Sequence, residues 1–216
     1  MIVSHRHKLI FTHIPKNAGT SIRAWLRQHV EDAQEIPGIH KHHTPHHFTD
    51  TVYGMDYTLF AVVRNPYDRL LSQYNFHVER YAGYLAPKSK LSRKELYHSK
   101  YTELKKGFAN WITDPYPMAD RQAKWYDYRW CPQALWCTPH THTLRFETLE
   151  QDFRWVQDRV GVAEPLETLN STSTDNDHRQ STNRVLLSDH RRLILSHLQV
   201  DFDRFGYAPD FDRSGQ

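Results

Sequence analysis

The chain has 216 residues, a formal charge of +3 and 13% aromatic residues. This length fits one domain with a sizeable apolar core, and the charge comes without the long Lys/Arg runs that are typical of nucleic-acid-binding tails. No apolar run approaches the roughly 20 residues that span a bilayer, and no signal-peptide core precedes the first motif. We therefore expect a soluble, cytoplasmic protein with neither a membrane nor a nucleic-acid partner.

Two strand–loop–helix units are predicted in the first third of the chain. An apolar run over residues 9–14 ends at Pro15, and apolar residues then recur at helical spacing from Ile22 to Val30. Residues 57–63 are apolar almost throughout, as in a parallel strand that is buried on both faces. Asn65 and Pro66 favour a helix that begins immediately after Arg64.

The rest of the chain predicts further alternation of strands and helices. Residues 81–120 are polar and rich in Tyr and Lys, which indicates a variable, partly helical excursion. A strand is expected over 141–146, then a helix opened by a Thr148–Gln151 capping box and ended near Gly161, and a terminal helix that stops at Gly206. The fold class is thus α/β, a short central parallel sheet flanked by helices in one domain over 1–216.

The first loop has the residue types of an anion site. A loop that enters a helix presents unpaired N–H groups at the positive end of the helix dipole, and here small residues, hydroxyls and a lysine line it. Because the lysine precedes the small residues, the loop is not a Walker A motif. An ordinary turn with a surface lysine is the competing interpretation. The candidate anion-binding residues are Pro15, Lys16, Asn17, Ala18, Gly19, Thr20 and Ser21.

A second anion site is predicted at the end of the other strand. Arg64 offers a guanidinium fork, and Ser72 offers a hydroxyl on the helix that follows. Alternatively, Arg64 pairs with a nearby carboxylate and Ser72 points to solvent.

These segments together resemble the sulfotransferases. HIPKNAGTSI and VVRNPYDRLLSQY are the strong matches, and LRFETLEQDF with the downstream Asn170-Ser171 and DFDRFGY is a weaker one. The resemblance is to the branch that contains heparan sulfate 2-O-sulfotransferase and its small bacterial relatives, and it implies a P-loop-like fold. It implies that the sulfuryl donor is 3′-phosphoadenosine 5′-phosphosulfate (PAPS). The first loop would hold the 5′-phosphosulfate of PAPS, and Arg64 and Ser72 would hold its 3′-phosphate. A small-molecule or glycan hydroxyl would accept the sulfuryl group, and residues 81–120 would lie on the acceptor side. Ala18 departs from the family, which usually has glycine there.

The catalytic base is sought in IHKHHTPHHF, residues 39–48. An imidazole can take a hydroxyl proton, and Thr44-Pro45 favours a helix start that leaves His42 outside the helix N-terminus, where the dipole favours a neutral ring. By resemblance His42 matches the family's catalytic histidine best and His40 next, while Lys16 stabilises the leaving oxygen. Since fixed N–H donors and a lysine can replace Mg²⁺, no metal is expected.

Three alternatives stay open at this point. The histidines could hold a metal at helical spacing, although Pro45 argues against a continuous helix there. The loop could serve a Mg²⁺-dependent nucleotide phosphotransferase, or the chain could be a zinc- and nucleic-acid-binding module. Several side chains are expected to be structural: Arg145 and Glu147 as an ion pair, Trp111, Trp125, Tyr126 and Trp130 as core, and Cys131 and Cys137 as thiols, with one local disulfide the alternative.

Overall fold

The structure is a computed structural model, and it describes residues 1–47, 56–86, 94–114, 128–167 and 187–210. These residues form two compact units, which are described separately. The first unit comprises the described residues of Met1–Asn65, Pro132–Ser171 and Val200–Tyr207, and the second those of Pro66–Cys131, Thr172–Gln199 and Ala208–Gln216. The expectation of a single domain stays a prediction.

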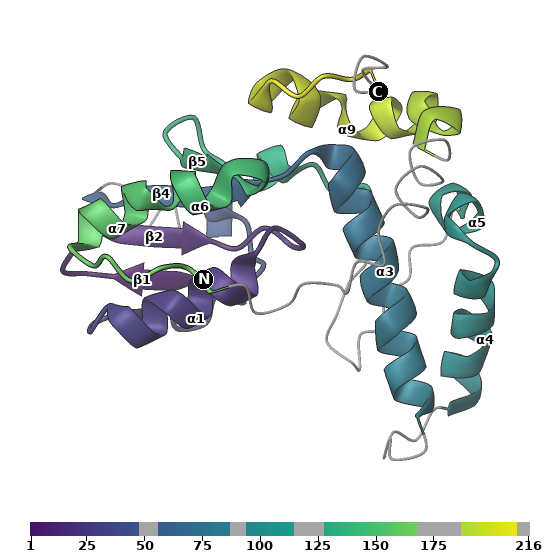
Figure 1. Ribbon diagram of the computed structural model, residues 1–216, viewed down its shortest axis with the longest axis horizontal. Helices are drawn as coiled ribbons and strands as arrows, with labels where there is room; N and C mark the ends of the chain where they lie inside the picture. The colour runs from purple at the N-terminus through teal and green to yellow at the C-terminus, as the bar shows by residue number, and fades with distance from the viewer. Residues whose placement is uncertain (48–55, 87–93, 115–127, 168–186, 211–216) are drawn as a thin grey trace. The chain divides into compact units, whose positions relative to one another are not determined.

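The first unit is built on a five-stranded mixed sheet (Figure 1). The strands run in the order β3-β1-β2-β4-β5. β2, β4 and β5 pair in parallel, whereas β1 pairs antiparallel with both β2 and β3. Their bounds are β1 Ile2–Ser4, β2 Leu9–Thr12, β3 Gln34–Glu35, β4 Thr58–Val63 and β5 His142–Arg145.

The parallel part of the sheet confirms the predicted α/β class, although the sheet as a whole is mixed and not purely parallel. All three parallel strands lie within the predicted segments, and β4 is buried along nearly its whole length. The antiparallel strands β1 and β3 were not predicted from the sequence. The consequence for the site is that β2 and β4, which precede the two predicted anion-binding segments, are direct neighbours and end at the same edge.

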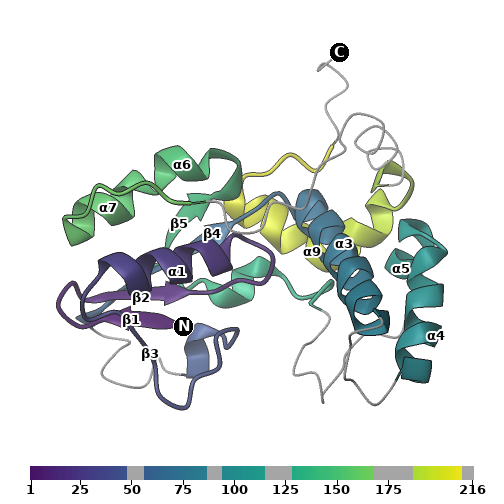
Figure 2. The ribbon, with the colours of Figure 1, turned by 60° about the horizontal axis from the view of Figure 1, so that its bottom comes forward.

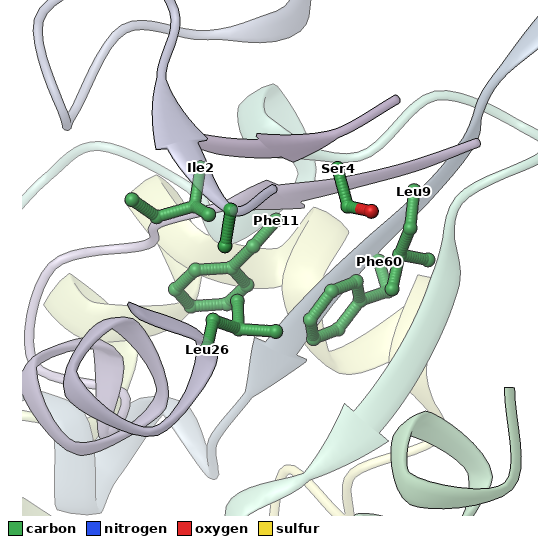
Figure 3. Close-up of a pocket in the computed structure, with 7 residues that line it drawn as sticks. Ile2, Ser4, Leu9, Phe11, Leu26 and Phe60 are labelled. Atoms are coloured by element: carbon green, nitrogen blue, oxygen red, sulfur yellow. The ribbon is translucent and has the colours of Figure 1, made fainter. Parts of the chain in front are cut away.

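Helices α1 (Gly19–His29), α6 (Leu149–Asp152) and α7 (Arg154–Val160) belong to this unit (Figure 2). α1 and α7 cover the same face of the sheet, where Trp25 meets Phe153 edge to face. A small cavity of about 10 Å³ lies in this core between Leu26, Phe11 and Phe60 (Figure 3). Its volume is close to that of a single water, so it offers no room for a substrate.

The predicted helix ends near Thr148 and Gly161 are correct, but the predicted capping box and the continuity of the helix between them are wrong. α1 follows the predicted loop, and Gly161 ends α7 in a left-handed conformation with φ 72°. The Thr148–Gln151 capping box does not form. The Thr148 hydroxyl donates to Asp152 instead, and the helix is interrupted at Phe153, whose side chain is buried in the core.

The second unit is helical in its described parts. α3 (Pro66–Leu85) begins at the predicted Pro66, and the expected partly helical excursion contains α4 (Lys94–Lys105) and α5 (Phe108–Thr113). Aromatic contacts such as Tyr81–Tyr97 and Tyr74–Phe108 join these helices. The terminal helix α9 (Arg191–Phe205) has its residues up to Gln199 in this unit and those from Val200 in the first unit, and it ends before Gly206 as predicted. Within the described part of the chain, no helix combines the length and the apolar character that a membrane crossing requires.

Candidate active site

The loop between β2 and α1 has two residues in the left-handed conformation. Lys16 has φ 73° and Ala18 has φ 55°, and α1 begins at Gly19. Ala18 occupies the N-cap position without a side-chain hydrogen bond to the helix, and the first turn carries no acidic residue. The positive φ at Ala18 explains a glycine preference at this position, because a methyl group there is strained.

Asn17 is turned inward from this loop. Its side chain is buried, and its amide nitrogen donates to the Val62 carbonyl at 2.7 Å and to the Gln133 side-chain oxygen at 2.5 Å. The first bond ties the loop to β4, and the second ties it to η2, a 3₁₀ turn over Gln133–Trp136. The Asn17 side chain therefore fixes the loop from inside.

Arg64 lies at the end of β4, beside the same loop. Its guanidinium stacks over the Phe146 ring at 4.1 Å and donates to the Lys16 carbonyl at 3.4 Å. Phe146 belongs to the 3₁₀ turn η3 (Phe146–Thr148), which follows β5. The two predicted anion-binding segments thus meet at one edge of the sheet. Ser72 lies on α3 in the second unit, and its assignment stays a prediction.

Gln133 connects these two segments and was missed by the sequence analysis. Its side-chain oxygen accepts from the Asn17 amide and from the Arg64 backbone N–H at 2.9 Å, and its amide nitrogen donates to the Arg64 carbonyl at 2.8 Å. No local pattern marks this residue, because its partners are 69 and 116 positions away along the chain.

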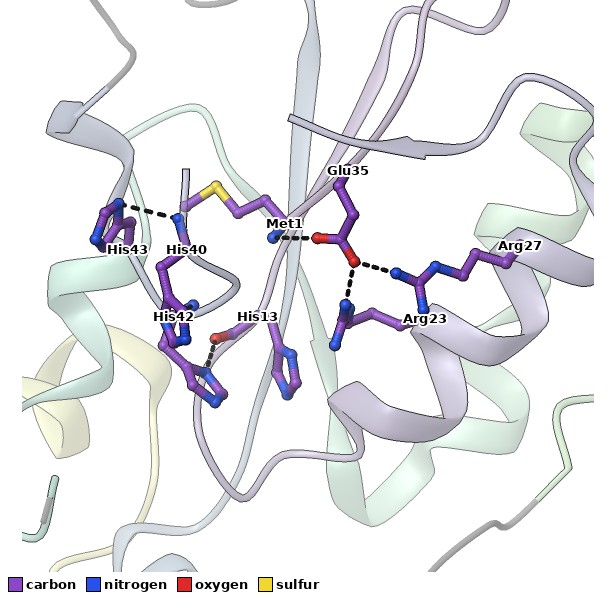
Figure 4. Close-up of polar contacts among 8 residues, drawn as sticks. All are labelled: Met1, His13, Arg23, Arg27, Glu35, His40, His42 and His43. Atoms are coloured by element: carbon purple, nitrogen blue, oxygen red, sulfur yellow. Dashed lines mark hydrogen bonds and ion pairs between the residues drawn. The ribbon is translucent and has the colours of Figure 1, made fainter. Parts of the chain in front are cut away.

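His42 is held at its ring and at its backbone. The ring Nδ1 lies 3.0 Å from the His13 carbonyl (Figure 4), and the His42 carbonyl accepts a hydrogen bond of 3.0 Å from the indole N–H of Trp136. Since a carbonyl only accepts, Nδ1 carries the proton and Nε2 is the unprotonated nitrogen of the neutral ring. The arrangement gives His42 the tautomer that a proton acceptor at Nε2 requires.

The charge state of His42 is set by burial. Removal from water lowers its pKa to about 3, and this effect outweighs the opposing hydrogen bond to His13. The 3₁₀ turn η1 (Pro45–His47) follows, so the predicted helix start at Pro45 is right, while the residues directly after His47 lie outside the described part of the chain. Burial is the main cause of the lowered pKa of His42, and the expected contribution of a helix dipole stays a prediction.

His13 packs between His42 and the helix start. The centroids of the His13 and His42 rings are 4.4 Å apart, and burial followed by proximity to His42 lowers the pKa of His13 well below its usual range. A Cβ placed on Gly19 would lie only 1.8 Å from the His13 ring. Gly19 is thus required by close approach of a side chain, and His13 joins the loop to the histidine segment.

The remaining histidines lie nearby without forming a metal centre. His40 donates its backbone N–H to His43, and its ring centroid is 5.6 Å from that of His42. Among residues 1–47 and the other described ranges, no three His, Cys, Asp or Glu side chains gather as ion ligands. The expectation that no metal is needed stays a prediction.

The side chains expected to be structural are indeed packed, but with other partners. Glu147 accepts from the Asn65 N–H at 2.6 Å and from the Tyr207 hydroxyl at 3.0 Å, and the Arg145 guanidinium stacks over the Tyr207 ring at 4.7 Å. Arg145 and Glu147 therefore meet through Tyr207, and the predicted direct ion pair is not formed between these two described residues.

The other predicted structural residues have separate outcomes. Trp111 is core, and Trp130 stacks on His197 at 4.3 Å, while Trp125 and Tyr126 lie outside the described residues. Asn170-Ser171, part of the weaker sequence match, also lies outside them. Cys131 and Cys137 are thiols, as expected.

Comparison with known proteins identifies the family. A family model described as "Sulfotransferase family" matches residues 1–208. The chain belongs to the sulfotransferase family. The match includes the ends of β2 and β4 and the histidine segment of this sulfotransferase. A transferase activity follows from the family membership. No curated protein and no solved structure matches the chain.

Proposed function

We propose that this sulfotransferase moves a sulfuryl group from PAPS to an acceptor hydroxyl. The observation that carries the proposal is the meeting of three elements at the edge where β2 and β4 end. Arg64 reaches the Lys16 carbonyl, and His42 is bonded to His13, the residue that follows β2. A cation, a helix start and a neutral imidazole thus lie together, as in-line transfer to a nucleophile requires.

The loop supplies the groups that favour a P-loop-like anion site. The left-handed residues Lys16 and Ala18 flank Asn17, an alternation that turns successive backbone N–H groups toward one side. These N–H groups and the start of α1 suit the 5′-phosphosulfate, and Lys16 offers its ammonium to the oxygen that leaves. Arg64, with Ser72, is assigned to the 3′-phosphate.

The chemical step is a single displacement at sulfur. The acceptor hydroxyl gives its proton to Nε2 of His42 as its oxygen forms a bond to sulfur, and the bond from sulfur to the 5′-phosphate oxygen breaks. The leaving oxygen keeps the electron pair, and its negative charge is stabilised by Lys16 and the loop N–H groups. His40 is the second choice as base, because it lies beside His42 without the same ring bond to His13.

A carbohydrate hydroxyl is the acceptor class that we propose. The support is the sequence match to the branch that contains heparan sulfate 2-O-sulfotransferase, so desulfated heparan-type oligosaccharides are the first acceptors to test. The described residues of 81–120, which were expected to shape the acceptor side, form α4 and α5 of the second unit.

Donor binding and turnover test the proposal separately. Titration with adenosine 3′,5′-bisphosphate should show a stoichiometric complex, and labelled PAPS with an oligosaccharide panel should show transfer without added Mg²⁺. Absence of bisphosphate binding would refute the proposal, and Mg²⁺-dependent turnover of ATP in its place would favour a phosphotransferase. Binding without transfer to any oligosaccharide would reject the carbohydrate acceptor and keep the donor assignment.

Single substitutions then separate the assigned roles. Lys16→Ala and His42→Ala should lower kcat by about 10²-fold or more and change donor affinity little, whereas Arg64→Ala should chiefly raise the donor KM. Because the pKa of His42 is about 3, kcat/KM should not fall through this residue between pH 8 and pH 5.5. If His40→Ala abolishes turnover and His42→Ala does not, the base is His40.

A further inference from the structure

We propose that the 3₁₀ turn Gln133–Trp136 is the positioning element of this site: Gln133 sets the two donor-binding segments relative to each other, and Trp136 sets His42. The terms donor and base depend on the function proposed above. The positioning itself is a claim about contacts within the first unit, so it can be tested without turnover.

Gln133 makes its contacts from a fully buried position. It is 0% exposed, and its side-chain amide uses both ends: the oxygen receives the Asn17 amide and the Arg64 N–H, and the nitrogen donates to the Arg64 carbonyl. The contacts to residue 64 involve its backbone, so they fix where the chain leaves β4. The contact to Asn17 fixes the loop after β2. One side chain therefore bridges the two segments, in addition to the direct bond from Asn17 to the Val62 carbonyl.

The turn is itself anchored by a buried carboxylate. Asp201 of α9 is 0% exposed, and it accepts the backbone N–H groups of Gln133 at 2.8 Å and Ala134 at 2.9 Å. Arg204, one turn further along the helix, donates to the carbonyls of Ala134 and Thr138. These bonds satisfy the ends of a turn too short to satisfy them itself. The turn is consequently a fixed reference for the residues that it contacts.

Trp136 lies at the other end of the turn and holds His42. Its indole is 2% exposed and donates to the His42 carbonyl at 3.0 Å, while the ring of the same histidine bonds to the His13 carbonyl. With its backbone held on one side and its ring on the other, His42 has a defined orientation. Loss of the indole N–H would leave the part-buried His42 carbonyl without this donor and free the segment to shift.

A matched pair of tryptophans separates positioning from stability. Trp25 is 4% exposed and also donates its indole N–H to a backbone carbonyl, that of Glu164 at 2.9 Å, in the same unit. Trp25→Phe and Trp136→Phe therefore delete the same group from similar surroundings. Both should lose stability to a similar extent, but only Trp136→Phe should alter His42.

The readout is the histidine ring signals in long-range ¹H–¹⁵N correlation spectra recorded against pH. In the wild type and in Trp25→Phe, we expect the Nδ1–H tautomer of His42 and no titration above pH 5. In Trp136→Phe, we expect mixed tautomers and a pKa that moves toward the ordinary value of about 6.5. An unchanged His42 in Trp136→Phe, or equal changes in both variants, would overturn the assignment of Trp136.

The assignment of Gln133 predicts the opposite pattern: donor affinity should change and His42 should not. Gln133→Met keeps the size of the side chain and removes its hydrogen bonds, so affinity for adenosine 3′,5′-bisphosphate should fall about tenfold or more while the His42 tautomer is retained. Gln157→Met is the control, because Gln157 also donates to backbone carbonyls in this unit but away from both segments. Equal losses in both variants, or affinity within twofold of the wild type for Gln133→Met, would overturn the assignment.

Two further measurements apply if Gln133→Met does not fold or if the wild type does not bind the bisphosphate. If Gln133→Met does not fold, Asn17→Ala removes the loop side of the same contact together with the bond to Val62, so affinity should fall at least as much; unchanged affinity there would overturn the assignment. If the wild type itself does not bind the bisphosphate, the proposed function fails. The Asn17 side-chain amide signal then decides the Gln133 contact, since it should shift in Gln133→Met and not in Gln157→Met.

Discussion

Replacement of Gly19 by alanine is the sharpest test of how the loop is packed. An added Cβ would lie 1.8 Å from Cδ2 and 1.9 Å from Nε2 of the His13 ring, whereas ordinary contact begins at 3.4 Å. The ring would have to retreat by about 1.6 Å, the difference between these contact distances. His13 is 5% exposed and lies against Phe11 and His42, so it cannot retreat without moving the proposed base.

The expected cost follows from the balance of two effects. Overpacking of a close-packed interior costs about 1–3 kcal/mol, and the better helix propensity of alanine returns up to about 1 kcal/mol. We therefore expect Gly19→Ala to lower the free energy of unfolding by about 1–2 kcal/mol, which for a chain of this size lowers Tm by roughly 2–8 °C. Urea denaturation and calorimetry measure both quantities.

The control is the exposed helical glycine Gly83, around which an added Cβ meets nothing within 4 Å. Gly83→Ala should raise stability by up to about 1 kcal/mol. In a double-mutant cycle, His13→Ala should remove most of the Gly19→Ala penalty, because the clashing ring is gone. The reasoning is refuted if Gly19→Ala is as stable as the wild type, or if its penalty is the same with and without the His13 ring.

Three further predictions follow from the same region and the cysteines. Ala18→Gly should raise the free energy of unfolding by about 1 kcal/mol, because it relieves the strain of an alanine in the left-handed conformation. Ala24→Gly, inside α1, should lower the free energy of unfolding by about 1 kcal/mol. Denaturant titration measures both variants, and a loss of stability in both would contradict the argument. The pKa of His42 is lower in the folded chain than in the unfolded chain, so the unfolded chain binds more protons between pH 6.5 and about pH 3. Acidification through this range should therefore lower the free energy of unfolding by up to about 1.4 kcal/mol per pH unit through this residue. His42→Gln should flatten this slope in urea titrations at pH 7, 6 and 5, and an unchanged slope would show that other groups cause it. Burial raises the pKa of the Cys137 thiol to about 12, whereas Cys131 is only half-buried. A thiol reagent at pH 8 should therefore modify Cys131 in the native protein and Cys137 only after unfolding. Equal modification rates for the two thiols would contradict the burial of Cys137.

Much of the fold could be predicted because its signals are local. The apolar run of β4 and the Pro66 helix start need only their own neighbours in sequence, and both are confirmed. β1 could not be predicted in this way, since three residues without a partner strand show no period. The Thr148 capping box failed because burial of Phe153 decides where that helix is interrupted, and burial depends on the whole core.

The residues of the candidate site likewise divide into those with a local sequence signal and those without one. The loop over residues 15–21 and Arg64 were identified from residue types at strand ends, although their donor contacts stay predictions. Gln133 and Trp136 were missed because a glutamine and a tryptophan near a proline give no local indication of what they contact. Their partners come from four distant parts of the sequence and become neighbours only in the folded chain.

The bonds made by the 133–136 turn have a consequence for how such an enzyme can change. On the Arg64 and His42 side they end on main-chain atoms, which every amino acid except proline carries. New side chains at positions 42 and 64 can therefore be tried by mutation while the scaffold beneath them keeps its shape.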